Sequence, residues 1–351
     1  MSVLSTYGLD LFRQYSIELE DNQELGRVIS DYGSKYRLIC QEGEINADLL
    51  GRLQFADLPE DQPKVGDWVI FMRVDDTAYI FQVLKRKNEL FRKSSGKGFT
   101  KQVMATNIDR VAVVQSLDQD FNIKRLERYL AQMAACELNT VVILNKADLI
   151  TDRQYYIDSV KRLQRDVPLF FCSTLSGEGI ETIETEVFQN ETTTVLLGSS
   201  GVGKSSLINS IFGTQLQEVK TRSEHTGKGR HTTTRRDLHI MPNGCLIIDT
   251  PGMREFGVNF DSAQHDLAFP LIAEISKDCR FRDCQHINEK ACAVKAAVKR
   301  GDLDEIIYNS YLKMMKEIQV FSESKQEKKR KGKQMGKMIR EVSNFRKKYK
   351  Y

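Results

Sequence analysis

Two short segments of the chain have the residue types that bind nucleotides, and they stand in an unusual order. Residues 198–205, GSSGVGKS, follow the apolar run VLL and lead into the helical pattern SSLINSIFG. Residues 145–148, NKAD, end an earlier apolar run. Both are guanine-nucleotide signatures, but an ordinary GTPase has the phosphate loop first and the base-reading loop last. The order therefore predicts that the cycle of motifs has been cut at another point.

The segment GSSGVGKS is expected to hold the phosphates. Glycines let backbone N–H groups close around phosphate oxygens, and a helix N-terminus favours an anion. Lys204 would reach the β- and γ-phosphates, and Ser205 would bind Mg²⁺. The predicted GTP contacts in this loop are Gly198, Ser199, Ser200, Gly201, Val202, Gly203, Lys204, Ser205 and Ser206.

Two later segments are expected to complete the phosphate side of the site. In CLIIDTPG, Asp249 ends an apolar strand and would hold Mg²⁺ through water, while the Gly252 N–H would meet the γ-phosphate. In GRHTTTRRD, which has the position of a switch, Thr233 or Thr234 would bind Mg²⁺. The alternative is that these threonines belong to an ordinary β-rich loop.

Asp148 makes guanine the expected base. Its carboxylate oxygens can accept hydrogen bonds from guanine N1–H and N2–H together, whereas adenine has an acceptor at N1 and no amine at C2. A buried carboxylate left unpaired would reject adenine strongly. Asn145 and Lys146 would brace the loop and pack on the base, and Ser173, in FCSTLSG, matches the usual backbone contact to guanine O6.

Three positions bear on how GTP would be hydrolysed. Met253 stands after DTPG, where many GTPases have a glutamine, and its side chain cannot orient water. Gly201 stands where potassium-activated relatives have an asparagine, which argues against potassium. His231 either orients or deprotonates water when the switch closes, or is a surface-loop histidine. We expect slow intrinsic hydrolysis that accelerates when a partner orders the switch.

A cysteine cluster near the C-terminus has the spacing of a metal site. Cys279, Cys284, His286 and Cys292 form C-x4-C-x-H-x5-C. Three thiolates and one imidazole make a closed, tetrahedral, structural Zn²⁺ site, since protein fills all four positions. The metal would fold a short segment with little core of its own. The alternative is three buried thiols and an incidental histidine.

The N-terminal segment that precedes these motifs is β-rich. Residues 26–44 predict two strands around a turn at 32–35, and 65–74 with 78–87 predict a second hairpin. Short strands in a segment of about ninety residues suit an OB-fold, although an SH3-like barrel would give the same pattern. Its cationic side chains form either an RNA-binding face or ordinary surface charge: Arg27, Lys35, Arg37 and Arg52.

Alternating strands and helices follow a Gly/Ser/Lys linker at residues 91–102. This alternation predicts a parallel sheet covered on both faces. Strands are expected at 111–117, 140–148, 167–174 and 193–198, and helices at 123–137, 153–166 and 180–188. After residue 260 the pattern becomes helical, at 291–300 and 302–318.

Composition favours a soluble globular protein of two or three domains, with 351 residues, 40% of them hydrophobic and 28% charged. No apolar run is long enough for a membrane span, and the N-terminus lacks a secretory signal. Seven cysteines, three of them beside a histidine, indicate metal in a reducing compartment rather than disulfides. We therefore expect a cytoplasmic protein.

The net charge of +4 hides a basic tail on a mildly acidic body. Residues 325–351 contain 12 Lys and Arg but only 2 Asp and Glu. Such a tail is often a solvated extension. Because it also contains Phe345, Tyr349 and Tyr351, it could instead grip RNA phosphates and stack on bases.

Taken together, these motifs resemble those of the RsgA/YjeQ family of circularly permuted GTPases, which act in small-ribosomal-subunit biogenesis. The resemblance covers nearly the whole chain, from the β-rich segment through NKAD, GSSGVGKSS, GRHTTT and DTPG to the cysteine cluster. It implies a multi-domain α/β protein with an N-terminal OB-fold-like β-barrel, a circularly permuted P-loop GTPase domain and a C-terminal helical zinc-binding domain. We expect these domains at 1–90, 91–260 and 261–324, followed by the basic tail at 325–351.

The resemblance also implies a function. It implies hydrolysis of GTP to GDP and phosphate during late small-subunit maturation, stimulated by that subunit, with the family's catalytic histidine at His231. The implied partners are the small ribosomal subunit, its rRNA and Mg²⁺-GTP, with one structural Zn²⁺ per chain. We expect a monomer with no membrane partner.

Two alternatives remain open on the sequence. One is a nucleotide-gated RNA-binding or scaffold protein in which turnover is incidental. The other is a large-subunit assembly GTPase, against which the zinc motif and Gly201 argue. Because DTPG leads directly into the zinc-binding segment, we also hypothesise a clamp that holds RNA with GTP and releases it with GDP.

Overall fold

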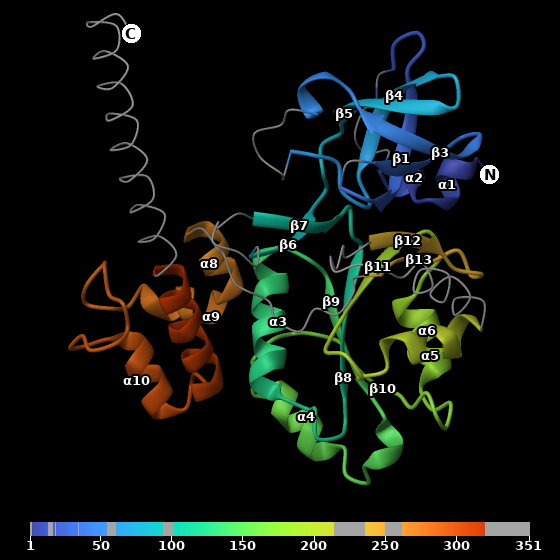
Figure 1. Ribbon diagram of the computed structural model, residues 1–351. Coiled ribbons are helices and arrows are strands. Elements are labelled where there is room, and N and C mark those ends of the chain that lie inside the picture. The colour runs from blue at the N-terminus through green and yellow to red at the C-terminus, as the bar shows by residue number, and fades with distance from the viewer. Residues whose placement is uncertain are drawn as a thin grey trace, which may run out of the picture.

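A computed structural model of the chain contains a small β-barrel, a sheet flanked by helices and a C-terminal helical unit (Figure 1). No helix among the described residues is long and apolar enough to cross a membrane. The structure describes residues 2–12, 17, 19–33, 35–54, 61–93, 101–213, 236–249 and 262–319.

The barrel has five strands that close in the order β1-β2-β3-β5-β4-β1, with β3 and β5 parallel and all other pairs antiparallel. This closure confirms the OB-fold-like expectation. Alternate residues point inward because successive strand side chains face opposite sides, so that Val28, Leu38 and Phe71 are fully buried. The strands are β1 (Glu24–Asp31), β2 (Tyr36–Cys40), β3 (Gly43–Leu49), β4 (Trp68–Val74) and β5 (Thr77–Val83).

One end of the barrel is covered by two short N-terminal helices, α1 (Val3–Thr6) and α2 (Leu9–Phe12). Phe12 stacks on Trp68 with ring centroids 5.6 Å apart, and both side chains are buried. A short 3-10 helix, η1 (Gly51–Leu53), follows β3.

The prediction of a linker at residues 91–102 is wrong for the residues at both ends of that range. Residues there form an antiparallel hairpin of β6 (Glu89–Lys93) and β7 (Lys101–Thr106). Phe91 and Val103 are buried in the same core cluster as Leu126, which lies in the helix at residues 123–135. This apolar packing fixes the flanks of the Gly/Ser/Lys run, and residues 94–100 lie outside the described part of the chain.

The central sheet has the predicted parallel strands in the order β10-β9-β8-β11-β13. A strand missed from the sequence, β12 (Arg236–Ile240), pairs antiparallel with β13. The parallel strands are β8 (Arg110–Ser116), β9 (Thr140–Asn145), β10 (Leu169–Phe171), β11 (Thr193–Leu197) and β13 (Leu246–Asp249).

Helices cover both faces of this sheet, as expected (Figure 1). On one face, α3 begins where the Asn122 side chain accepts a hydrogen bond from Arg125 N at 3.0 Å. The helices on that face are α3 (Ile123–Ala135) and α4 (Gln154–Lys161), and those on the other are α5 (Ile180–Val187) and α6 (Lys204–Phe212).

The C-terminal helical unit packs on α3, where Ala131 and Ala135 share a core cluster with Phe269 and Met314. Polar contacts add to this packing, since Arg165 binds the buried Glu127 and donates to Ala268 O at 2.8 Å. The unit contains α8 (Ser262–Ala268), α9 (Pro270–Ser276), α10 (Ala293–Arg300) and a further helix at residues 305–319.

The barrel and the central sheet are continuous, because β1 also pairs with β12. Ser30 and Asp237 are backbone partners in this pairing, and Ser30 Oγ donates to Asp237 Oδ1 at 2.6 Å. The result is one 11-stranded sheet in which the barrel and the nucleotide-site strands share hydrogen bonds.

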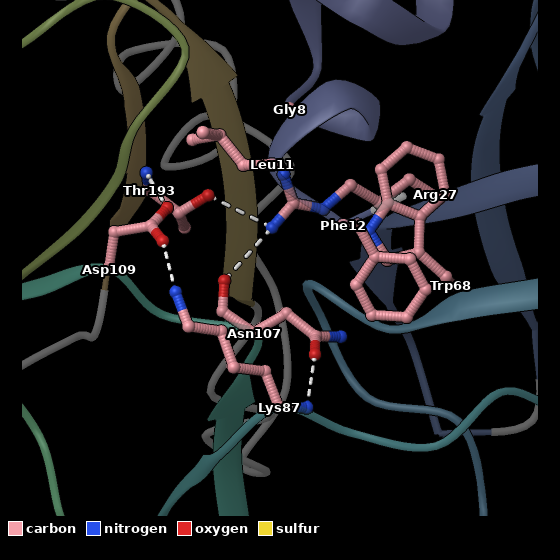
Figure 2. A pocket seen from close by; sticks show the side chains of 9 residues that line it. All are labelled: Gly8, Leu11, Phe12, Arg27, Trp68, Lys87, Asn107, Asp109 and Thr193. Carbon is pink, nitrogen blue, oxygen red and sulfur yellow. Dashed lines mark hydrogen bonds and ion pairs between the residues drawn. The ribbon is translucent and has the colours of Figure 1, made fainter. Parts of the chain in front are cut away.

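Arg27 lies buried at this junction, so both alternatives given for it, an RNA-binding face and ordinary surface charge, are wrong (Figure 2). Its side chain is only 2% exposed, and its guanidinium lies 5.4 Å from the Trp68 ring centroid. It donates to Thr193 Oγ1 at 2.9 Å and to the carbonyls of Tyr7 and Asn107 at 2.6 and 3.2 Å. Burial lowers the pKa of Arg27 to about 10.

Replacing Arg27 by methionine should destabilise the protein, because buried acceptors on both sides of the junction would lose their donor. We expect the free energy of unfolding to fall by about 3 kcal/mol, measured by urea denaturation. The control is Arg37→Met, whose half-exposed guanidinium pairs with Glu44. That change should cost less than about 0.5 kcal/mol. Equal stability of the two variants would contradict the role of Arg27.

Candidate nucleotide site and metal centre

The predicted nucleotide-binding loops meet at one edge of the sheet. The carboxyl ends of parallel strands lie at the same edge, which is where ligands bind in open α/β sheets. NKAD follows β9, the Ser173 loop follows β10 and the phosphate loop follows β11. The sheet order therefore brings together segments that the permuted chain keeps apart.

The phosphate loop has the backbone that its glycines allow. Gly198 and Gly203 have φ of 147° and 94°, conformations that side chains rarely adopt. A Cβ on Gly198 would lie 2.3 Å from Val114 O, so this position also lacks room for one. Lys204 begins α6, and its Nζ donates to Gly198 O at 2.7 Å and to Ser199 O at 2.8 Å.

The other predicted loop residues differ in exposure. Ser200, Gly201, Ser205 and Ser206 are exposed at the surface, whereas Val202 is fully buried. The exposed residues and the first turn of α6 are open to a ligand, while Val202 anchors the loop in the core under α6.

Asn145 connects the base-reading loop to the phosphate loop. Its fully buried amide donates from Nδ2 to Val202 O at 3.0 Å. Its Oδ1 accepts from Lys146 N at 2.8 Å and from Thr174 N at 3.4 Å. A Cβ on Gly203 would lie 2.2 Å from Asn145 Nδ2, so the loop needs glycine there to approach this amide. Asn145 therefore connects the two loops directly.

Asp148 and Ser173, the two residues predicted to contact the base, lie side by side. Ser173 Oγ donates to Asp148 Oδ1 and accepts from Leu175 N at 3.2 Å and from Ser176 N at 3.1 Å. Ser173 is fully buried, whereas Asp148 is exposed in the 3-10 helix η2 (Ala147–Leu149). This arrangement orients a carboxylate toward solvent at the edge where a base would bind.

Sequence reasoning missed Asp118, which follows β8. Its Oδ2 accepts a hydrogen bond from Lys146 Nζ at 2.6 Å. The hydrogen bond from Lys146 lowers the pKa of Asp118 to about 2, so the carboxylate is ionised near neutral pH. The only signal in the sequence was its position after an apolar strand, because the sheet order that places β8 between β9 and β11 is a tertiary feature.

The remaining predicted phosphate-side residues are not tested by the geometry. Asp249 is the last residue of β13, which pairs with β11 through Ile248 and Val195, so its backbone reaches the same edge of the sheet. Four of the predicted nucleotide-site residues lie outside the described part of the chain: His231, Thr233, Thr234 and Gly252.

The four predicted metal ligands converge. The sulfur atoms of Cys279, Cys284 and Cys292 and a ring nitrogen of His286 all lie within 4.8 Å of one another. His286 Nδ1 is 3.4 Å from Cys292 Sγ and 3.6 Å from Cys279 Sγ. A tetrahedral ion with bonds of about 2.0–2.3 Å would separate its ligand atoms by about 3.3–3.8 Å. The cluster could therefore hold one metal ion.

The surroundings of this cluster favour the metal-binding form of its histidine and hold its loop in place. Burial lowers the pKa of His286, which favours the neutral imidazole that binds metals. The carbonyl of His286 accepts from Tyr308 Oη at 2.6 Å, which ties the ligand loop to the last described helix. Cys292 stands at the start of α10, where its Sγ accepts from Lys295 N at 3.4 Å.

The other four cysteines are buried away from this cluster, and no pair forms a disulfide. Burial raises the pKa of Cys136 to about 11 and the pKa values of Cys172 and Cys245 to about 12. These three thiols are therefore protonated at neutral pH. All four buried cysteines, Cys40 included, pack as core residues.

Comparison with known proteins gives a consistent result. The family model for the RsgA GTPase matches residues 83–259. The chain is 39% identical over 342 residues to the small ribosomal subunit biogenesis GTPase RsgA 1 of Bacteroides thetaiotaomicron, covering 97% of this chain and 96% of that protein. It is 38% identical over 317 residues to the protein of the same name from Listeria monocytogenes, covering 90% and 89%.

Solved structures agree with these relatives. YjeQ from Thermotoga maritima superposes with a TM-score of 0.62 at 27% identity, covering 84% of this chain and 98% of that one. YloQ, described as a circularly permuted GTPase, superposes with a TM-score of 0.56 at 24% identity, covering 87% and 98%. The YloQ likeness supports the fold alone.

Replacing Cys292 by serine should remove the metal, because a neutral hydroxyl is a poor substitute for a thiolate ligand. We expect metal content, measured by inductively coupled plasma mass spectrometry, to fall from one ion per chain to a small fraction. The control is Cys40→Ser, because the Cys40 thiol lies in the barrel and donates to Gly43 O at 3.1 Å, a bond that serine can keep. Full metal content in the Cys292 variant, or equal loss in both variants, would rule out this site.

Proposed function

The chain belongs to the RsgA GTPase family, and we propose that it binds the small ribosomal subunit and hydrolyses GTP to GDP and phosphate during late maturation of that subunit. The observation that carries this proposal is that Asn145 joins a base-reading loop to a phosphate loop in a chain whose relatives match along nearly its whole length. The relatives are named for small-subunit biogenesis, and the hydrogen bond between Asn145 and Val202 supports the proposal that the two loops of this chain form one nucleotide site.

The nucleotide would lie across the carboxyl edge of the sheet. Lys204 would leave its present carbonyl partners for the β- and γ-phosphates, which offer a stronger charge-assisted bond. Ser205 and Asp249, with Thr233 or Thr234, would hold Mg²⁺. At the other end of the site, Asp148 and the Ser173 loop would select guanine.

In the metal cluster, Zn²⁺ fits the donor set best, because three thiolates and one imidazole suit tetrahedral zinc. With four protein ligands, the ion would have a structural role in the loop between α9 and α10. That unit is packed on α3 and held by Arg165 and Glu127. It would therefore keep a fixed position relative to the GTPase domain. We propose that the protein acts as a monomer in the cytoplasm and that it contacts small-subunit rRNA.

The proposal is tested by measuring GTP turnover by the protein without ribosomal subunits, with small subunits and with large subunits. We expect turnover to accelerate with small subunits and not with large subunits. The acceleration should weaken at higher salt because RNA contacts release counterions. Acceleration by large subunits and not by small subunits would indicate a role in large-subunit assembly. Acceleration by neither subunit would favour a nucleotide-gated binding protein, and this proposal would fail.

His231 would orient or deprotonate the attacking water once the subunit orders the switch. His231→Ala should reduce the subunit-stimulated single-turnover rate by about 100-fold, with subunit binding unchanged. His225→Ala, six residues earlier in the chain, is the matched control and should hydrolyse GTP at the wild-type rate. Full stimulated turnover in the His231 variant would exclude this role.

A further inference from the structure

We propose that Asp118 is a positioning residue for the guanine base, holding the Lys146 side chain in the orientation that packs on the purine. This inference deepens the proposed function and rests on it, since it assumes that NKAD reads guanine. It assigns a role to a residue outside every nucleotide motif of the chain.

The sheet order places Asp118 between the two halves of the site. β8 lies between β9, which leads into NKAD, and β11, which leads into the phosphate loop. Asp118 is in the loop that connects β8 to α3, two residues beyond Ser116 at the end of the strand. The NKAD lysine therefore has a carboxylate beside it because of the sheet order, and not because of sequence proximity.

The Asp118 carboxylate is itself held in place. Its Oδ1 accepts from Ser116 Oγ at 2.8 Å and from Asp120 N at 2.9 Å. The loop is closed further on, where Asn122 N donates to Gln115 Oε1 at 3.0 Å. These bonds occupy Oδ1 and direct Oδ2 toward the Lys146 ammonium, 2.6 Å away.

Lys146 is constrained from both ends by this contact. Its backbone has a left-handed φ of 64°, and its N–H donates to Asn145 Oδ1. With Nζ fixed on Asp118, the intervening methylene chain has few orientations left. A lysine stem held in this way can cover an apolar ring face while its charge remains solvated. Fixing it before binding removes an entropy cost that the nucleotide would otherwise have to offset.

The pair is too exposed to serve mainly in stability. The side chains of Lys146 and Asp118 are 33% and 30% exposed, and ion pairs at such exposure add little to folding. We therefore expect the Lys146–Asp118 pair to affect nucleotide affinity. The affinities for GDP and GTP should change equally, because both nucleotides contain the guanine base.

Asp118→Asn tests this role, because the amide keeps the size of the side chain and can still accept from Ser116, but loses the charge that holds Lys146. We expect the Kd of fluorescent GDP and GTP analogues to rise by about tenfold, as for the loss of one immobilised side chain. The single-turnover rate at saturating GTP should stay within about twofold of wild type, because the γ-phosphate end is untouched. Asp118→Glu should recover part of the affinity.

Asp120→Asn is the matched control, since only the backbone N–H of Asp120 contacts Asp118, whereas its side chain pairs with Arg125 at 2.6 Å. It should leave nucleotide affinity and thermal unfolding unchanged. An equal loss of affinity in the Asp120 variant, or a wild-type Kd in the Asp118 variant, would overturn the proposal.

A double-mutant cycle with Lys146→Met shows whether Asp118 acts through the lysine. In that background, Asp118→Asn should weaken nucleotide binding by less than about twofold, because the partner it would release is gone. Additive losses would show that Asp118 acts by another route, and the proposal would be wrong.

A separate variant distinguishes failure of this inference from failure of the proposed function. Asp148→Asn should lower affinity for GTP and raise it for xanthosine triphosphate, because an amide can donate to the xanthine C2 carbonyl. Unchanged preference for GTP in that variant would refute the guanine site itself. A changed preference together with a wild-type Kd for Asp118→Asn would refute only the role of Asp118.

Discussion

The nucleotide site depends on one buried amide. Asn145 donates across to the phosphate loop at Val202 O, and its oxygen accepts from the next peptide and from the loop after β10. A buried amide with partners on three loops fixes their spacing, since breaking any one bond would leave a polar group unpaired away from water. This interaction is insensitive to chain order, so a permuted chain can assemble the same edge of the sheet.

Much of this arrangement could be predicted, because its causes are local. The phosphate loop needs glycines where φ is positive, and the OB-fold-like barrel needs alternating apolar strands, so both leave a pattern in the sequence. The spacing of Cys279, Cys284, His286 and Cys292 predicted that they converge, and the structure brings them together in a cluster that could hold a metal ion. The nearness of NKAD to GSSGVGKS followed from strands that end at one edge of a parallel sheet.

What could not be predicted depends on long-range packing. Arg27 has the sequence context of a surface cation, and only the closing of the barrel against β11 buries it. The β6–β7 hairpin was hidden by the Gly/Ser/Lys run between its strands, although Phe91 anchors it in the core. Strand β12 pairs with the distant β1 as well as with β13, which follows it in the sequence, and Asp118 meets Lys146 only through the sheet order. The contacts of Arg27 and of Asp118, and the pairing of β1 with β12, join residues that lie far apart in the sequence.

The position of β11 between β8 and β13 has a consequence for synthesis of the chain. Strands β8, β9 and β10 are contiguous in sequence, so a nascent chain can pair them while the phosphate loop is still unmade. Until β11 arrives, β8 has a free edge that other strands could occupy. The base-reading half of the sheet thus precedes the phosphate half in time, and a partly made chain has no complete site in which to trap a nucleotide.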